Sequence, residues 1–269
     1  MPRTGTGPDF IEALARGLEV ITAFAPQRPV MSLSEVATAT GLARPTARRI
    51  LLTLEELGYV RTDERGFALT PRVLDLGMAY VGSLGLWDVA RPHMERLVAR
   101  TRESCSVAQL DGGDIVYVAR VAVPKIVTLS VRIGTRFPAL QTSLGKVLLA
   151  ALEPAELERT LAEPTRSGLT PLWCPGEEER DAALREVRAR GWALADEDLA
   201  LGIRSVAVPL RDGEGRVIAA INVNAHAAET SLDDLRDRHL PALLQTAGDI
   251  SADFARLTAV PRAVAAVQG

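Results

Sequence analysis

Cysteine and histidine are scarce in this chain. Its 269 residues include two cysteines, Cys105 and Cys174, and three histidines, His93, His226 and His239. The cysteines form no paired motif and the histidines have no metal-ligand spacing, which argues against a disulfide framework and against a zinc site. We therefore expect no metal ion and no cofactor.

Long apolar runs and targeting segments are also missing. At 269 residues, the chain has room for one large or two modest domains. No apolar run approaches the roughly 18 residues that a membrane-spanning helix needs. The N-terminus has neither the apolar stretch of a signal peptide nor the composition of a transit peptide. We therefore expect a cytoplasmic protein with no membrane partner.

The signatures of common enzymes are absent as well. The sequence has no Gly-x-Ser-x-Gly elbow and no dinucleotide-binding glycine pattern. The Gly145-Lys146 pair does not belong to a phosphate loop, because Leu140 replaces the required first glycine and Val147 replaces the required Ser or Thr. We therefore expect no catalytic residue.

The chain also lacks bulk positive charge. Its formal net charge is −3 and its pI is about 5.8. The first 70 residues hold eight arginines against eight aspartates and glutamates. Any binding of nucleic acid must therefore depend on where individual arginines are placed, and not on overall charge.

Residues 32–69 carry the most informative pattern. Gly41 and Gly58 each follow a helical stretch, and the second helix opens with a proline, which suits a first helical turn. This order of helix, turn, helix and hairpin predicts a winged helix-turn-helix, whose second helix enters a DNA groove. The expected elements are helices over Ser34 to Thr40 and Pro45 to Leu57, then strands over Tyr59 to Thr62 and Gly66 to Leu69.

The second of these helices is amphipathic. Its apolar residues recur at helical spacing and predict one buried stripe, made of Ala47, Ile50, Leu51, Leu54 and Leu57. The opposite face and the hairpin are rich in arginine, which binds phosphates and guanine edges. A solvated basic face of an ordinary bundle is the alternative, which the surrounding motif disfavours. The candidate DNA-binding residues are Arg44, Pro45, Thr46, Arg48 and Arg49 of the helix, with Arg61 and Arg65 of the wing.

Other periodic segments extend the first domain and define a second. A helix from Asp9, its expected N-cap, to Ala25 should pack under the motif through Phe10, Leu14, Leu18, Ile21 and Phe24. A linker helix is expected from Pro71 to about Gly82. The predicted boundaries are 1–70 for the DNA-binding domain, 71–85 for the linker, 86–258 for a second domain and 259–269 for a tail.

The second domain reads as α+β with a largely antiparallel sheet, because strands, hairpin turns and helices are mixed along it. A capping box, Ser231 with Asp234, should open the last helix, and Pro241 should kink it. Helices are expected over Trp87 to Glu103, Ser143 to Ala151, Pro154 to Ala162, Glu177 to Arg190 and Ser231 to about Leu257. Strands are expected over Ser106 to Leu110, Ile115 to Val121, Ile126 to Ile133, Trp192 to Ala195, Ser205 to Leu210 and Val217 to Val223.

Several separated segments resemble the IclR family of bacterial transcriptional regulators. They are ARGLEVITAF, SLSEVATATGLARPTARRIL, LEELGYV, FPALQTSLGKVLLA, DEDLALGIRSVAVPL and GRVIAAINVNA, in this order along the chain. The first segment, and the longer stretch VRIGTRFPALQTSLGKVLLA that contains the fourth, look most like the branch that controls protocatechuate and para-hydroxybenzoate catabolism. The resemblance implies a winged helix-turn-helix, a linker helix and a GAF-like effector domain, assembled as a homodimer or dimer of dimers.

The resemblance also implies an effector pocket. The backbone N–H groups of Ser143 and Leu144 would bind a ligand carboxylate, as helix N-termini favour anions. Asn222 and Asn224 lie two apart and so share one face of a strand. The remaining implied positions are polar Ser205, acidic Asp196, and the apolar walls Leu129 and Phe137.

The residues themselves add a possible carboxylate clamp and leave three functions open. Arg136, with Arg132, would form the clamp, although exposure at the strand edge is the alternative. We predict a ligand-responsive regulator of a catabolic operon that binds double-stranded DNA and a small aromatic or keto carboxylate, of the protocatechuate or para-hydroxybenzoate type. The alternatives are a constitutive DNA binder with a non-functional pocket, and an enzyme that uses the α/β domain, where acidic pairs such as Asp196 and Asp198 are common on loops.

Overall fold

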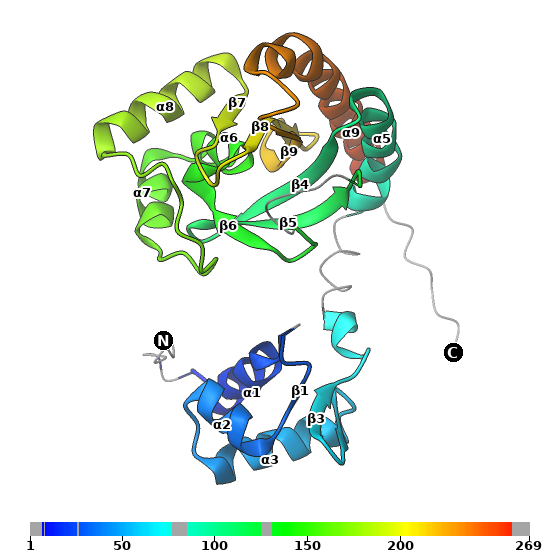
Figure 1. The fold of residues 1–269 in the computed structure, drawn as a ribbon, viewed down its shortest axis with the longest axis vertical. Helices are drawn as coiled ribbons and strands as arrows, with labels where there is room; N and C mark the ends of the chain where they lie inside the picture. The colour runs from blue at the N-terminus through cyan, green and yellow to red at the C-terminus, as the bar shows by residue number, and fades with distance from the viewer. Residues whose placement is uncertain (1–6, 8, 26, 77–84, 125–130, 260–269) are drawn as a thin grey trace. The chain divides into compact units, whose positions relative to one another are not determined.

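The computed structural model describes residues 7, 9–25, 27–76, 85–124 and 131–259 (Figure 1). Contacts divide the chain into two compact units, one ending at residue 83 and the other beginning at residue 84. Each unit has a buried apolar core of its own. Of the predicted linker helix, residues 73–76 are helical, and most of the remainder lies outside the described residues.

The N-terminal unit is a winged helix-turn-helix, as predicted. Ala47, Leu51 and Leu54 of its third helix are buried, together with Val36 and Met31 from neighbouring elements. A two-residue strand that the sequence analysis missed, β1, pairs with β3 and gives the sheet order β1-β3-β2. The elements are α1 (Glu12–Ala23), β1 (Val30–Met31), α2 (Leu33–Thr40), α3 (Arg44–Glu56), β2 (Val60–Asp63) and β3 (Gly66–Leu69).

Local signals fix the start and end of α2. The Ser32 hydroxyl accepts a hydrogen bond from the Glu35 N–H at 3.3 Å, and the Glu35 carboxylate accepts one from the Ser32 N–H at 2.7 Å. These bonds hold the pKa of Glu35 below its usual value. Gly41 ends the helix with a φ of 66°, a left-handed conformation that glycine adopts without strain.

The packing of α1 differs from the prediction. The helix begins at Glu12 after Ile11, so Asp9 is not its N-cap. Its core face passes through Val20, which is fully buried, and Phe24. Val20 and Phe24 are four residues apart and therefore lie on one side of the helix, next to the side that was predicted to pack. Leu14 lies off the packed side and is 62% exposed. The predicted core residues that are exposed instead are Phe10 before α1, Leu14 and Leu18 of α1, and Leu57 after α3.

The C-terminal unit is a mixed α/β structure with a fully antiparallel sheet, which confirms the predicted class. In the described residues the six strands have the order β6-β5-β4-β9-β8-β7. Figure 1 shows α5 and α9 side by side, and both contact the sheet. The elements are α5 (Leu86–Thr101), β4 (Ser104–Asp111), β5 (Asp114–Val121), β6 (Arg136–Pro138), the 3-10 turn η1 (Ala139–Gln141), α6 (Ser143–Ala150), α7 (Pro154–Ala162), α8 (Glu177–Arg190), β7 (Ala193–Asp196), β8 (Ile203–Arg211), β9 (Val217–His226), the π-helical η2 (Asp234–His239) and α9 (Leu240–Ala259).

The edge strand next to β5 lies later in the chain than predicted. Residues 126–130 of the expected strand lie outside the described residues, and residues 131–133 are not in a strand. The partner of β5 is instead β6, with Phe137 opposite Ile115. Gly134, with a φ of 86°, turns the chain just before β6.

The final helix contains the irregularity that its proline predicts. Ser231 accepts a hydrogen bond from the Asp234 N–H at 3.0 Å, as expected for the opening cap. A π-helical segment, η2, then precedes α9, and Pro241 lies directly after the junction. Proline has no N–H to donate and its ring clashes with the carbonyl four residues earlier, so a wider turn at this point accommodates it.

Candidate functional site

The exposed face of α3 carries the predicted DNA-binding residues. Ala43 is the N-cap, so the helix begins at Arg44 and Pro45 occupies its first turn. The guanidinium groups of Arg44, Arg48 and Arg49 belong to exposed residues, and Thr46 is half-buried. None of these three arginines forms an ion pair with another described residue. Three unpaired cations at one end of a recognition helix suit phosphates and base edges.

The two arginines of the wing differ from each other. Arg61 forms an ion pair with Asp63 at 2.9 Å. Arg65 lies in the two-residue turn between β2 and β3, is exposed, and donates its backbone N–H to Asp63 at 2.9 Å. The N–H of Arg65 and then the Arg61 side chain hold the pKa of Asp63 below its usual value. Arg65 is therefore the wing cation whose side chain is more available to a DNA backbone.

A cavity lies between the sheet of the C-terminal unit and the elements over it. It brings together four of the predicted effector residues, Phe137, Ser205, Asn222 and Asn224. β8 and β9 place Ser205 directly opposite Asn224, which explains why residues distant in sequence share one wall. The lining residues are Tyr117, Val131, Phe137, Gln141, Thr142, Ala195, Asp198, Leu199, Ile203, Ser205, Asn222 and Asn224.

The N-terminus of α6 reaches this cavity. Thr142, which lines it, caps the helix by accepting a hydrogen bond from the Gly145 N–H at 2.9 Å. The buried hydroxyls of Ser143 and Ser205 are 2.7 Å apart. A Cβ on Gly145 would lie 2.0 Å from the carbonyl oxygen of Ala139, so only glycine allows this approach. The Leu144 side chain lies in the apolar core, which leaves only its backbone for the predicted ligand contact.

The two asparagines on β9 differ in their hydrogen bonding. The Oδ1 of Asn222 accepts a hydrogen bond from the Ser106 N–H at 3.1 Å, which fixes that side chain to the sheet. The Oδ1 of Asn224 is buried and has no hydrogen-bond partner among the described residues. Buried polar atoms are rarely left without a partner, so the Asn224 oxygen is suited to a ligand donor.

Sequence reasoning missed several cavity residues. Tyr117 is two residues from the buried Ile115, so strand alternation on β5 would have placed it on this wall. Burial raises the pKa of Tyr117 to about 12. Asp198 belongs to the same acidic segment as Asp196, and no sequence signal distinguishes the two. Asp198 accepts a hydrogen bond from Lys146 Nζ at 2.5 Å, and the ammonium lies 4.4 Å from the Trp173 ring centroid.

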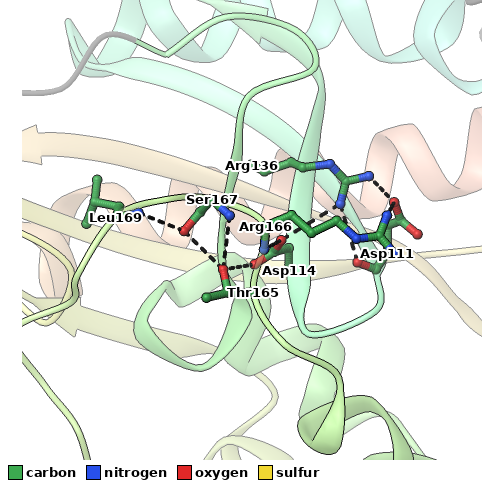
Figure 2. A network of polar contacts seen from close by, with 7 residues as sticks. All are labelled: Asp111, Asp114, Arg136, Thr165, Arg166, Ser167 and Leu169. Atoms are coloured by element: carbon green, nitrogen blue, oxygen red, sulfur yellow. Dashed lines mark hydrogen bonds and ion pairs between the residues drawn. The ribbon is translucent and has the colours of Figure 1, made fainter. Parts of the chain in front are cut away.

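Three predicted effector residues are not brought to the cavity by the described structure. Arg136 forms ion pairs with Asp111 and Asp114 at the tip of the β4–β5 hairpin (Figure 2). Asp196 pairs with Arg204 instead. Leu129 lies outside the described residues. Arg132, the second half of the expected clamp, is exposed.

The network around Arg136 has a structural role. Asp114 is 1% exposed and accepts hydrogen bonds from the Thr165 hydroxyl at 2.5 Å and the Arg166 N–H at 2.7 Å. Figure 2 shows these groups converging from the hairpin and from the segment after α7. Because Arg136 and these donors satisfy the buried carboxylate, the guanidinium is committed to holding the two segments together.

A basic recognition helix in one unit and a cavity lined by polar and apolar side chains in the other define a ligand-responsive, DNA-binding transcriptional regulator. Residues 13–64 match the IclR helix-turn-helix domain, and residues 78–252 match the model described as bacterial transcriptional regulator IclR C-terminal. The chain belongs to the IclR family.

Named relatives share nearly the whole chain. The Pca regulon regulatory protein of Pseudomonas putida is 38% identical over 244 residues, covering 90% of this chain and 84% of its own. The p-hydroxybenzoate hydroxylase transcriptional activator of Acinetobacter baylyi is 36% identical, covering 90% and 91%. An IclR homolog from Microbacterium hydrocarbonoxydans, solved with 4-hydroxybenzoate, is 26% identical with a TM-score of 0.78, covering 91% and 99%.

These relatives are regulators of transcription and not enzymes, so the chain is not assigned a catalytic role. Within the described residues, no group of three or more His, Cys, Asp or Glu side chains is arranged to hold a metal ion. In the same part of the chain, no helix is both long and apolar enough to cross a membrane.

Proposed function

We propose that this regulator controls an operon for the catabolism of a hydroxylated aromatic acid, and that the acid binds in the cavity of the C-terminal unit. The observation that supports it most is the meeting of Ser205, Asn222 and Asn224 with the N-terminus of α6. Relatives above 30% identity are named for the Pca regulon and for p-hydroxybenzoate hydroxylase.

The carboxylate would bind at the first turn of α6. The N–H groups of Ser143 and Leu144 have no acceptor within the helix, and the helix dipole favours an anion there. Tyr117 and Phe137 pack edge to face, with ring centroids 5.7 Å apart, and supply an apolar wall for an aromatic ring. An apolar wall with a few fixed polar groups discriminates aromatic acids from short keto acids by size.

At the operator, α3 would enter the major groove and Arg44, Pro45, Thr46, Arg48 and Arg49 would contact bases and phosphates, with Arg61 and Arg65 beside the groove. Two copies are needed for two half-sites about 34 Å or a multiple apart, so we propose a homodimer or dimer of dimers. Effector binding would favour one arrangement of the dimer and change the separation of its recognition helices. Because bacterial operator DNA lies in the cytoplasm, we propose that the protein acts there.

A thermal-unfolding titration tests the effector assignment. Purified full-length protein is heated with 4-hydroxybenzoate, protocatechuate, benzoate, pyruvate and glyoxylate. An aromatic acid at 100 times its dissociation constant should stabilise the protein by about 2.7 kcal/mol. Stabilisation by the keto acids alone would overturn the aromatic assignment. Flat curves for every acid, with intact operator binding, would favour a constitutive DNA binder.

A further inference from the structure

Arg120 on β5 is a partly buried cation beside the effector cavity. Its Nη1 donates a hydrogen bond to the Ser106 hydroxyl at 2.9 Å, and burial lowers the pKa of the guanidinium. Ser106 lies opposite Arg120 on one side and opposite Asn222, a cavity residue, on the other. Residues directly opposite one another on neighbouring strands share a face, so all three side chains belong to the cavity side of the sheet.

Within the described part of the chain, the charge of Arg120 has no carboxylate counter-ion. Among the described residues no carboxylate forms an ion pair with it. Every Asp and Glu of the sequence is a described residue, because residues 1–6, 8, 26, 77–84, 125–130 and 260–269 include neither type. A guanidinium stays charged and is costly to bury unpaired, so an oxygen from outside the protein is its natural partner.

The separation between the Arg120 guanidinium and the N-terminus of α6 matches the length of an aromatic acid whose carboxylate lies at α6. The Arg120 guanidinium is held over Ser106 on β4, whereas the N-terminus of α6 is bonded to Ser205 on β8. In the sheet, β9 lies between these strands, so the separation is two strand spacings, or about 10 Å. A benzene ring with oxygen substituents at opposite positions, hydrogen-bonded at each end, matches this span. Asn224, on β9 directly opposite Ser205, lies one strand spacing, about 5 Å, from Ser205 toward β4, and it supplies the buried oxygen that lacks a donor.

We propose that Arg120 and Asn224 form a second polar end of the effector site, which recognises a ring hydroxyl. The Arg120 guanidinium donates to the hydroxyl oxygen, and the hydroxyl proton is donated to Asn224 Oδ1. The carboxylate remains at α6. This inference rests on the proposed function, and it adds that the regulator distinguishes hydroxylated benzoates from benzoate itself.

Calorimetric titration with 4-hydroxybenzoate and benzoate tests whether Arg120 and Asn224 recognise the ring hydroxyl. Wild-type protein should bind the hydroxylated acid about tenfold more tightly or better, since an unmet buried polar group costs that much. Arg120→Met and Asn224→Leu should each reduce this preference to about threefold or less, and in Arg120→Met the benzoate affinity should stay within about threefold of wild type. Arg100→Met, which removes an exposed arginine from α5, should keep the full preference.

The outcomes separate the inference from the function on which it rests. A preference unchanged in both variants overturns it. An equal loss for both acids in Arg120→Met also overturns it, because Arg120 would then hold the carboxylate. If Arg120→Met does not fold, as its melting curve would show, Asn224→Leu and Arg120→Lys decide the matter by the same ratio. A wild-type protein that binds neither acid defeats the proposed function itself.

Discussion

At the scale of single residues, the Lys146–Asp198 pair shows how one contact serves both stability and binding. The two side chains are 10% and 17% exposed, and the Lys146 ammonium also donates to the Leu194 carbonyl at 3.3 Å. Asp198 lines the cavity, so the ammonium neutralises a carboxylate that would otherwise face an anionic effector. The pair joins α6 to the segment before β8.

We expect Lys146→Met to lower the free energy of unfolding by about 2 kcal/mol, because it leaves a largely buried carboxylate without its partner. It should also weaken the binding of 4-hydroxybenzoate through repulsion from Asp198. Urea unfolding and calorimetric titration measure the two effects. The double variant Lys146→Met with Asp198→Asn should recover part of both. Equal effects in the single and double variants would show that the two groups are not coupled.

At the scale of elements, α3 concentrates the determinants of DNA binding. Arg48 and Arg49 are exposed and make no ion pair within the described chain, so no such pair is lost when either is removed. If either reads a base, its replacement by Ala should cost roughly 1–3 kcal/mol of operator affinity and relax preference at one position. A replacement that removes only a phosphate contact should weaken all duplexes alike.

Selection of bound duplexes from a random pool with the wild-type protein provides the operator, and fluorescence anisotropy then gives the affinities. Arg185→Ala on α8 removes the same charge from the other unit and should leave the affinity unchanged. Full operator affinity in the Arg48→Ala, Arg49→Ala double variant would contradict the assignment of α3 to the groove.

The elements also show which features the sequence can predict. The ends of α2, α3 and α8 depend on local signals, a cap or a glycine, and these were placed within one or two residues. The face of α1 that packs, and the partner of Arg136, depend on contacts with distant segments, which periodicity does not encode. Arg136 was expected at a ligand, but Asp111 and Asp114, more than twenty residues away, hold it.

The cavity residues also divide into those that the sequence can predict and those that depend on contacts between distant segments. Ser205, Asn222 and Asn224 were placed by a family resemblance and by strand alternation, and the antiparallel register of β8 and β9 then brings them to one wall. Arg120 was not singled out, because the register of β5 against β4, including the irregularity between Val107 and Ala108, decides that it faces the cavity side. A one-residue change of register reverses every side chain, so isolated sequence patterns leave this undetermined.

At the scale of the whole molecule, regulation requires thermodynamic coupling between effector binding and operator binding. The two sites belong to separate compact units, so the effector acts on DNA only if it binds two states of the assembly with different affinity. Such coupling typically amounts to about 1–3 kcal/mol, or roughly 5- to 150-fold in affinity, and it is reciprocal.

We therefore expect two factors to be equal. One is the factor by which saturating 4-hydroxybenzoate changes the dissociation constant of the operator. The other is the factor by which saturating operator changes the dissociation constant of 4-hydroxybenzoate. Anisotropy with labelled operator measures the first, and calorimetry with and without operator measures the second. Asn224→Leu should shift effector affinity while leaving operator affinity without effector unchanged, because the substitution lies in the C-terminal unit. Unequal factors at matched salt would mean that the two titrations do not report one two-state equilibrium. A factor of one in both titrations would show that the cavity and the recognition helix are uncoupled, whatever the cavity binds.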